Sequence, residues 1–143
     1  MKLTQLSIFI ENRAGTLANI ANTLGEAGIN IRAMSLADTS EFGIIRLIID
    51  DLDTARDVLK DQGYAVSISE VIAVEIPDRP GELGRLLGIF ADSELNVEYM
   101  YAFVQKNMDR AVMILRLDDM DRAIEAAKAN GVRILEGERV ATM

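Results

Sequence analysis

One stretch of this 143-residue sequence occurs twice, first as Asn12-Arg13-Ala14-Gly15-Thr16-Leu17 and then as Asp78-Arg79-Pro80-Gly81-Glu82-Leu83. Each copy follows a run typical of a strand, at residues 6–10 and 71–76, and opens a run typical of a helix. Each predicts a tight turn in which glycine can take a positive φ and lets another backbone or a ligand come close. The free N–H groups at the start of a helix can bind a carboxylate. One copy would indicate only a chain reversal, whereas two copies favour a ligand-binding turn.

The repeat extends through both halves of the chain. Gly15 and Gly81 are 66 residues apart, and so are Asn30 and Asn96 (81 − 15 and 96 − 30). Equivalent residues further along are 68 apart, which places a two-residue insertion of the second half near residues 106–108. A period of this length, repeated once, predicts two copies of one small domain, at residues 1–69 and 70–143.

The apolar pattern of each half predicts the element order β-α-β-β-α-β. In the first half the helical spacing is carried by Leu17, Ile20, Ala21 and Leu24. Right-handed crossovers then place both helices on one face of a four-stranded antiparallel sheet, the ferredoxin-like α+β arrangement. Residues 66–76 contain neither glycine nor proline. We therefore expect the two domains to be held together tightly rather than joined by a flexible tether.

Strand alternation predicts which side chains face away from the helices. This second face of the two sheets is predicted to carry Phe9, Ile44, Ile48, Val112 and Ile114. So much apolar surface is more than a monomer of this size usually exposes, and it predicts a homodimer.

Composition excludes several classes of function. The net charge is −8 and the pI about 4.5, which argues against a nucleic-acid partner. The chain has no histidine and no cysteine, so we expect no catalysis, no metal and no cofactor. The acids at residues 50–53 and 118–121 each precede a predicted helix, where capping explains them better than a cation site does. No signal peptide or membrane span is predicted, and we expect a cytoplasmic protein without a membrane partner.

The duplicated turn, in this order of strands and helices, resembles the ACT domain family. The second copy resembles the most typical loop of that family, and Asn30-Ile31 and Asn96-Val97 resemble the starts of its second strands. The resemblance covers nearly the whole chain, as two tandem ACT domains without a catalytic domain. It implies that the domains pair side by side into an eight-stranded antiparallel sheet with four helices on one face. It also implies that amino acids bind at the seam between the domains.

The resemblance further implies two sites, each combining one turn with the start of the second strand in the other half. The implied ligand-binding residues are Asn12, Ala14, Gly15, Thr16, Leu17, Asn96 and Val97 at the first site, and Asp78, Pro80, Gly81, Glu82, Leu83, Asn30 and Ile31 at the second. Serine-binding members carry a histidine two residues before the loop asparagine. This chain has Ile10 and Ile76 at those positions, which argues against serine as the ligand.

The chemistry of these residues suits an α-amino acid. Turn N–H groups suit its carboxylate, and side-chain oxygens of Asn12, Asp78, Asn30 and Asn96 suit its ammonium group. Simpler roles stay open, because Asn30 and Asn96 can merely begin a strand and Asp78 can merely cap a helix.

The sequence therefore leaves three functions open. The favoured one is a non-catalytic regulatory protein that binds an amino acid and signals to a partner enzyme of amino-acid metabolism. The alternatives are a structural interaction module with no ligand and, least favoured, an enzyme that uses its carboxylates.

Overall fold

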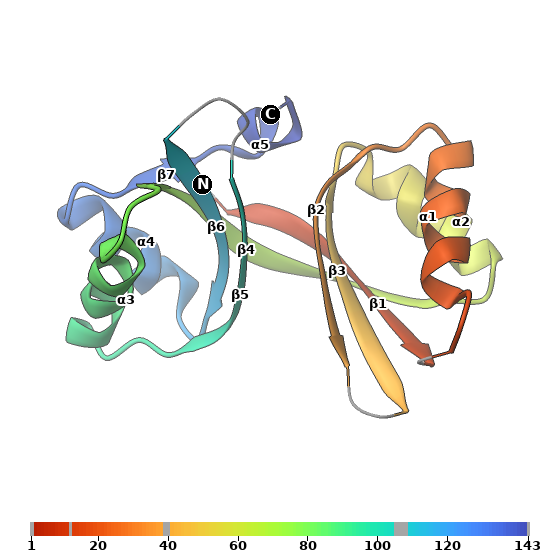
Figure 1. Cartoon of the computed structure of the whole chain (residues 1–143), viewed down its shortest axis with the longest axis horizontal. Helices are drawn as coiled ribbons and strands as arrows, with labels where there is room; N and C mark the ends of the chain where they lie inside the picture. Colours follow the sequence, from red (N-terminus) through yellow and green to blue (C-terminus); the bar gives the residue numbers. More distant parts are fainter. Residues whose placement is uncertain (1, 12, 39–40, 105–108, 143) are drawn as a thin grey trace. The chain divides into compact units, whose positions relative to one another are not determined.

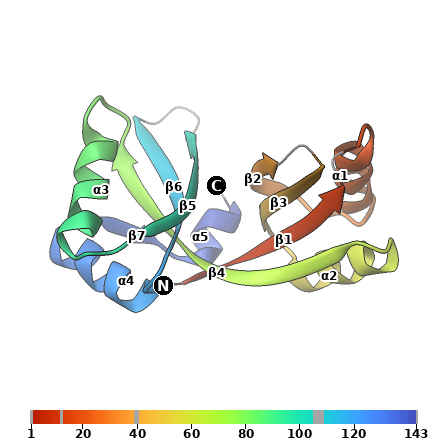
Figure 2. The ribbon, with the colours of Figure 1, turned by 90° about the horizontal axis from the view of Figure 1, so that it is seen from below.

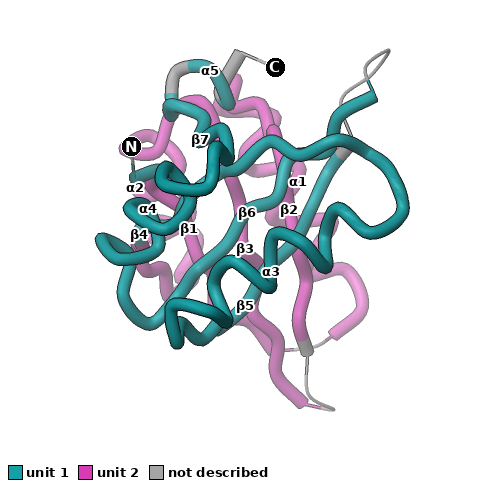
Figure 3. The backbone as a smooth tube through the Cα atoms, turned by 90° about the vertical axis from the view of Figure 1, so that its left-hand side faces the viewer, with its two compact units in different colours: residues 1–3, 70–141, 143 teal, residues 4–69, 142 magenta. Residues whose placement is uncertain are grey.

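The structure is a computed structural model that describes residues 2–11, 13–38, 41–104 and 109–142. The chain divides into two compact units (Figure 3). Unit 2 comprises residues 4–69 with residue 142, and unit 1 comprises residues 1–3, 70–141 and 143. Each unit is described by itself.

Unit 2 contains the first repeat, in which two helices cover one face of a sheet (Figure 1). Its elements are β1 (Leu3–Glu11), α1 (Thr16–Glu26), β2 (Ile31–Asp38), β3 (Phe42–Ile49), α2 (Leu52–Asp61) and the first residues of β4 (Ala65–Pro77). The strand order is β2-β3-β1-β4, in which β3 runs antiparallel to both β1 and β2. This is the predicted ferredoxin-like order, with β2 at the edge.

Unit 1 contains the second repeat in the same order. Its elements are the rest of β4, α3 (Glu82–Asp92), β5 (Val97–Val104), β6 (Arg110–Leu117), α4 (Met120–Ala129), β7 (Arg133–Leu135) and α5 (Gly137–Thr142). β6 pairs antiparallel with both β5 and β4, and β7 pairs antiparallel with β4. Here β5 is the edge strand, at the position that β2 has in unit 2.

The strand count differs from the eight that the resemblance implied. The described residues form seven strands, because residues 65–77 are one strand that ends the first repeat and begins the second (Figure 2). The physical reason lies in its sequence, which has no glycine and no proline before Pro77 to interrupt an extended chain. The structure also has a fifth helix, α5, which the sequence pattern did not predict.

Each unit has its own apolar core between its helices and its sheet. In unit 2 the fully buried Ile20 and Leu24 of α1 pack with residues of α2, β1 and β3. In unit 1 Leu86 and Phe90 of α3 take the same places, and Ala123, Ala126 and Ala127 line the inner face of α4. Phe90, a larger side chain than Leu24, lies in unit 1 opposite these small alanines.

The second face of the sheets is less exposed than the sequence pattern predicted. Ile48, Val112 and Ile114 are all buried, so they offer no free apolar surface. Phe9 remains 48% exposed, and Ile44 beside it is half-buried. Of the five described residues predicted to lie on this face, Phe9 and Ile44 are therefore the two that keep exposed apolar surface.

Candidate functional site

The two copies of the repeated stretch fold into turns with the same backbone geometry. Gly15 precedes α1 with φ 89° and ψ −15°, and Gly81 precedes α3 with φ 90° and ψ −18°. This is the left-handed region, which glycine adopts at little cost. The predicted positive φ is therefore confirmed at both glycines.

The hydrogen bonds of the two turns also match one for one. The N–H of Arg13 donates to the carbonyl of Glu11 at 2.9 Å, and the N–H of Arg79 donates to that of Pro77 at 3.0 Å. Thr16 and Glu82 each donate to the carbonyl three residues back, at 3.3 Å in both turns. Two segments with different side chains thus share one backbone design, which presents the first N–H groups of a helix at the end of a strand.

Two leucines at the helix starts lie outside the core. Leu17 was expected to belong to the apolar stripe of α1, but it is 36% exposed, and Leu83 at the same place in α3 is 39% exposed. The stripes begin one turn later, because only residues beyond the first helical turn lie over the sheet. An exposed leucine at the same place in both repeats gives each turn an apolar contact surface beside its N–H groups.

The two asparagines predicted as ligand contacts are fixed through their backbones. The N–H of Asn30 donates to Asp50 Oδ1 at 3.1 Å, and the N–H of Asn96 donates to Asp118 Oδ1 at 3.0 Å. Both side chains are exposed. These aspartates were not predicted to act here, although their repetition at the 68-residue spacing is the signal that could have found them.

A register irregularity follows each asparagine. The pairing of β2 with β3 shifts between Ile31 and Ala33, and the pairing of β5 with β6 shifts between Val97 and Tyr99. Irregularities of this kind include β-bulges, which bend a strand, redirect its side chains and are frequent beside binding sites. Sequence periodicity over so few residues does not reveal it.

The structure does not bring a turn together with the asparagine of its own unit. Gly15 precedes α1, whereas Asn30 follows its end. A helix of 11 residues is about 16 Å long, so these two residues are at opposite ends of it. The same holds for Gly81 and Asn96 in unit 1. A single repeat therefore does not bring its own turn and its own asparagine together.

The turn of unit 2 borders a cavity of about 410 Å³. Arg13 and Thr16 of the turn line this cavity, together with residues 9–11 of β1 and residues 62–65. Nearby, Asn19 Nδ2 donates to the Tyr64 hydroxyl at 2.6 Å. Tyr64 had not been singled out from the sequence, because it lies 45 residues from its partner and in no motif. Asn12 lies outside the described residues.

The charges around the two turns differ. Arg13 Nε lies 3.2 Å from Glu11 Oε2, so this arginine pairs with the preceding strand. Arg79 Nη2 lies 2.9 Å from Glu82 Oε1, so this one pairs with the following helix. Asp78 is exposed, and its N–H donates to the carbonyl of Asp109 at 2.8 Å. The two turns thus share a backbone but present different charges to a ligand.

Aspartates cap the second helix of each repeat, as the sequence predicted. Asp51 Oδ1 accepts from the N–H of Thr54 at 3.1 Å, and Asp119 Oδ1 accepts from the N–H of Arg122 at 3.1 Å. The Thr54 hydroxyl, and then the Thr54 N–H, lower the pKa of Asp51 from its ordinary value of 3.8. Among the residues that the structure describes, no group of three or more acidic side chains could hold a metal ion.

We expect replacement of Asp51 by alanine to lower the melting temperature at neutral pH. A folded-state pKa below 3.8 means that this cap contributes stability above pH 3.8 and loses it as pH falls through the folded pKa. The difference in melting temperature between the wild type and the variant should therefore shrink as the pH falls below 3.8. Thermal unfolding measured from neutral pH into acid tests this. Thr54→Val is the control, because it removes only the hydroxyl donor and should weaken the pH dependence while keeping the backbone bond. A deficit that does not change with pH would contradict the role given to the charge.

Comparison with known proteins agrees with this geometry. The family model for the ACT domain pair matches residues 1–143, and the chain belongs to this family. A crystal structure of protein BT0572 from Bacteroides thetaiotaomicron is 35% identical, with a TM-score of 0.94 over 100% of this chain and 98% of that one. No curated protein matches this chain.

The regulatory subunit of aspartate kinase shares the fold. The Thermus thermophilus subunit in its ligand-free form is 15% identical with a TM-score of 0.66, covering 88% of this chain and 90% of that one. The Thermus flavus subunit is 18% identical with a TM-score of 0.60, covering 88% of each chain.

In the part of the chain that the structure describes, none of the helices is both long and apolar enough to span a membrane.

Proposed function

We propose that this chain is a non-catalytic regulatory protein that binds an amino acid through its two ACT domains, residues 1–69 and 70–143. The observation that carries this proposal is the pair of turns, which match in φ, in ψ and in hydrogen bonds. A turn needed only to reverse the chain has no reason to keep helix N–H groups and an exposed leucine in both copies. Such groups suit the carboxylate and the side chain of a small amino acid.

The proposed binding places are the seams between the domains, with one turn and one asparagine at each. Within each repeat these two parts lie at opposite ends of a helix, which favours the crossed combination. Gly15 and Leu17 would act with Asn96, and Gly81 and Leu83 would act with Asn30. The pairing of the domains into one sheet with these seams, and a homodimer of the whole chain, belong to the same proposal.

We further propose that a partner enzyme of amino-acid metabolism senses the bound state. The fold that this chain shares with aspartate kinase regulatory subunits supports a regulatory role. A ligand regulates only if it binds one of two states better than the other. Binding at a seam meets this condition, because it stabilises one arrangement of the two domains over others.

A thermal-shift screen against the twenty amino acids tests the proposal. A ligand at one hundred times its dissociation constant stabilises the folded chain by about 2.7 kcal/mol, which corresponds to a rise of roughly 5–10 °C in melting temperature. One amino acid, or a group of similar ones, should give such a rise. If none does, the chain is the structural interaction module and the sensor proposal fails.

Two single substitutions then test the crossed sites by calorimetry. Asn96→Ala should weaken the site with Gly15, and Asn30→Ala should weaken the site with Gly81. Each leaves its backbone bond to Asp118 or Asp50 in place, so the fold is kept. Asp78→Asn should change the affinity of only one site, because the first turn has a neutral residue there. A loss confined to the uncrossed site would overturn the assignment.

A further inference from the structure

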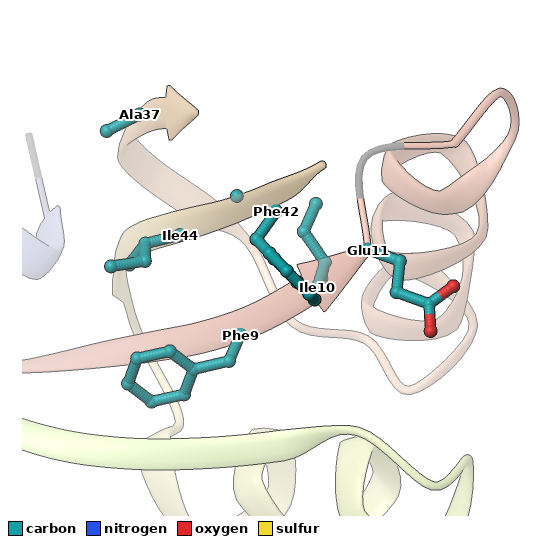
Figure 4. A pocket seen from close by; sticks show the side chains of 7 residues that line it. Phe9, Ile10, Glu11, Ala37, Phe42 and Ile44 are labelled. Carbon is teal, nitrogen blue, oxygen red and sulfur yellow. The ribbon is translucent and has the colours of Figure 1, made fainter. Parts of the chain in front are cut away.

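Two cavities of unit 2 adjoin the last residues of β1. The first, which we call the apolar hollow, has a volume of about 560 Å³ and is lined by residues 9–11 of β1, residues 42–44 of β3 and Ala37 of β2 (Figure 4). The second, which we call the polar cavity, is the one of about 410 Å³ that the turn of unit 2 borders. Residues 9–11 line both cavities. Because β1 lies between β3 and β4, and neighbouring strands are ~4.8 Å apart, one molecule of the size of an amino acid can reach both.

The side chains of the apolar hollow are those that hold an apolar group. Phe9 and Ala37 are both register partners of Ile44, so these three side chains share one face of the sheet. Phe42, two residues before Ile44 on β3, lies on that face as well. Glu11 is the charged member of the lining, and its carboxylate points away from Ala37 and Ile44 (Figure 4). Two phenylalanine rings among aliphatic side chains favour a ligand that carries a ring, since aromatic rings pack well edge to face or offset.

The fold does not require the apolar hollow, because the second repeat carries larger residues at two of the same places. Phe103 of β5 corresponds to Ala37, and Ala111 of β6 corresponds to Gly43. A methyl group added to Gly43 would lie 3.3 Å from Ile10 Cγ1, so a side chain there would crowd this wall. The first repeat thus keeps small residues where the second has a ring and a methyl group, and this difference leaves room for a ligand beside the turn.

Two charged side chains of opposite sign line the polar cavity. Glu11 Oε2 and Arg13 Nε are 3.2 Å apart, and both residues belong to the lining. An α-amino acid offers a carboxylate to Arg13 and an ammonium group to Glu11. Both side chains are more than 60% exposed, so these ion pairs orient the ligand but contribute little to its affinity. The affinity then depends on the apolar area that the rest of the ligand buries.

We propose that the amino acid bound at the turn of unit 2 has an aromatic side chain, which lies in the apolar hollow while its charged groups lie in the polar cavity. This inference rests on the proposed function, because it takes the ligand of that turn to be an amino acid, and it adds the chemical class. A small side chain would leave the hollow unfilled. A charged one would lose its water against Phe9 and Ile44 without gaining a partner. An aromatic ring, with ~150–250 Å² of surface, buries the largest apolar area.

Calorimetry on the full chain tests the class of ligand, with phenylalanine and alanine as the first two probes. Phenylalanine should bind at least ~100-fold more tightly than alanine, because alanine lacks the ring. Phenethylamine, which has no carboxylate, and 3-phenylpropionate, which has no ammonium group, should each bind more weakly than phenylalanine. Leucine, which is apolar but has no ring, should bind less tightly than phenylalanine.

The matched pair of variants is Ala37→Phe and Ala102→Phe. Ala37→Phe copies the second repeat and fills the apolar hollow from an exposed position, so the fold is kept. It should weaken phenylalanine binding at the turn of unit 2 at least ~10-fold. Ala102→Phe adds the same ring at an exposed position of β5 in unit 1, and it should leave this binding unchanged. Phe9→Glu, which copies Glu75 of the second repeat, is a second variant that should weaken binding.

The outcomes separate this inference from the proposed function. Binding of a small or charged amino acid with no binding of an aromatic one would overturn the inference and leave the proposed function standing. Tighter binding of leucine than of phenylalanine would also overturn it. So would full phenylalanine binding by Ala37→Phe and Phe9→Glu. A change in the mass of Ala37→Phe in solution, with ligand binding unchanged, would assign the apolar hollow to another protein chain instead. If none of the twenty amino acids binds, both proposals fail together.

Discussion

Replacement of Phe90 by alanine is expected to lower the free energy of unfolding of unit 1 by about 3–5 kcal/mol. Phe90 is completely buried in α3 and packs with β4, β6 and the small alanines of α4. Removal of the ring loses its transfer free energy and leaves a cavity, because rigid strands and helices close over it only in part. Domains of this size have about 5–15 kcal/mol of stability in all, so this is a large share of it.

The two repeats make this prediction specific to one unit. Leu24 stands at the equivalent place in unit 2, and Leu24→Ala should cost about 2–5 kcal/mol there. Hydrogen exchange read peptide by peptide distinguishes the two variants. Phe90→Ala should lose protection first in α3, β5 and β6, and Leu24→Ala should lose it first in α1, β2 and β3. Phe90→Leu, which copies the other repeat, should cost less than Phe90→Ala. A loss below about 1 kcal/mol for Phe90→Ala would contradict the packing described for unit 1.

Sequence periodicity predicted most of the fold because the repeat supplied each pattern twice. The strand and helix order of each repeat and the caps Asp51 and Asp119 follow from local spacing and are confirmed. Local spacing could not show that the last strand of one repeat is also the first strand of the next. The two strands are continuous because residues 65–77 contain no glycine or proline that would end a strand before Pro77. Apolar periodicity shows where strands lie, but it does not show whether two neighbouring strands are joined into one.

The parts that sequence reasoning missed depend on contacts between distant residues. Asp50 and Asp118 resembled further capping residues, yet they hold the backbone of Asn30 and Asn96 from 20 and 22 residues away. The burial of Ile48 and Ile114 could not be predicted from the alternation of apolar residues along a strand. Alternation assigns a side chain to one face of the sheet, but it does not show whether that face is covered. Helices often end at a glycine with positive φ, but beyond the end of α3 this backbone conformation is adopted by Glu94, with φ 57°.

The two repeated turns were found because their glycines are needed for a backbone reason. The same reason predicts that two similar glycine substitutions change stability in opposite directions. Gly81→Ala places a methyl group on a residue with φ 90° and no atom within 4 Å of the added carbon. Its cost is therefore that of left-handed backbone alone, about 1–2 kcal/mol. Gly88→Ala places the same group in the interior of α3, again with open space around it. Alanine is there the better helix former, so it should stabilise the chain by about 1 kcal/mol.

Chemical denaturation of the two variants should thus show midpoints that lie on opposite sides of the wild type. Their difference of about 2–3 kcal/mol exceeds the error of the measurement. Gly15→Ala and Gly25→Ala form the same pair in unit 2, with φ 89° at Gly15 and a helical backbone at Gly25. If Gly81→Ala and Gly15→Ala leave stability unchanged but abolish ligand binding, the glycines serve only the approach of the ligand. If they lower stability and leave binding unchanged, the turns serve only the fold. The proposed function requires both effects, because the backbone that holds the N–H groups toward the ligand is the one that glycine permits.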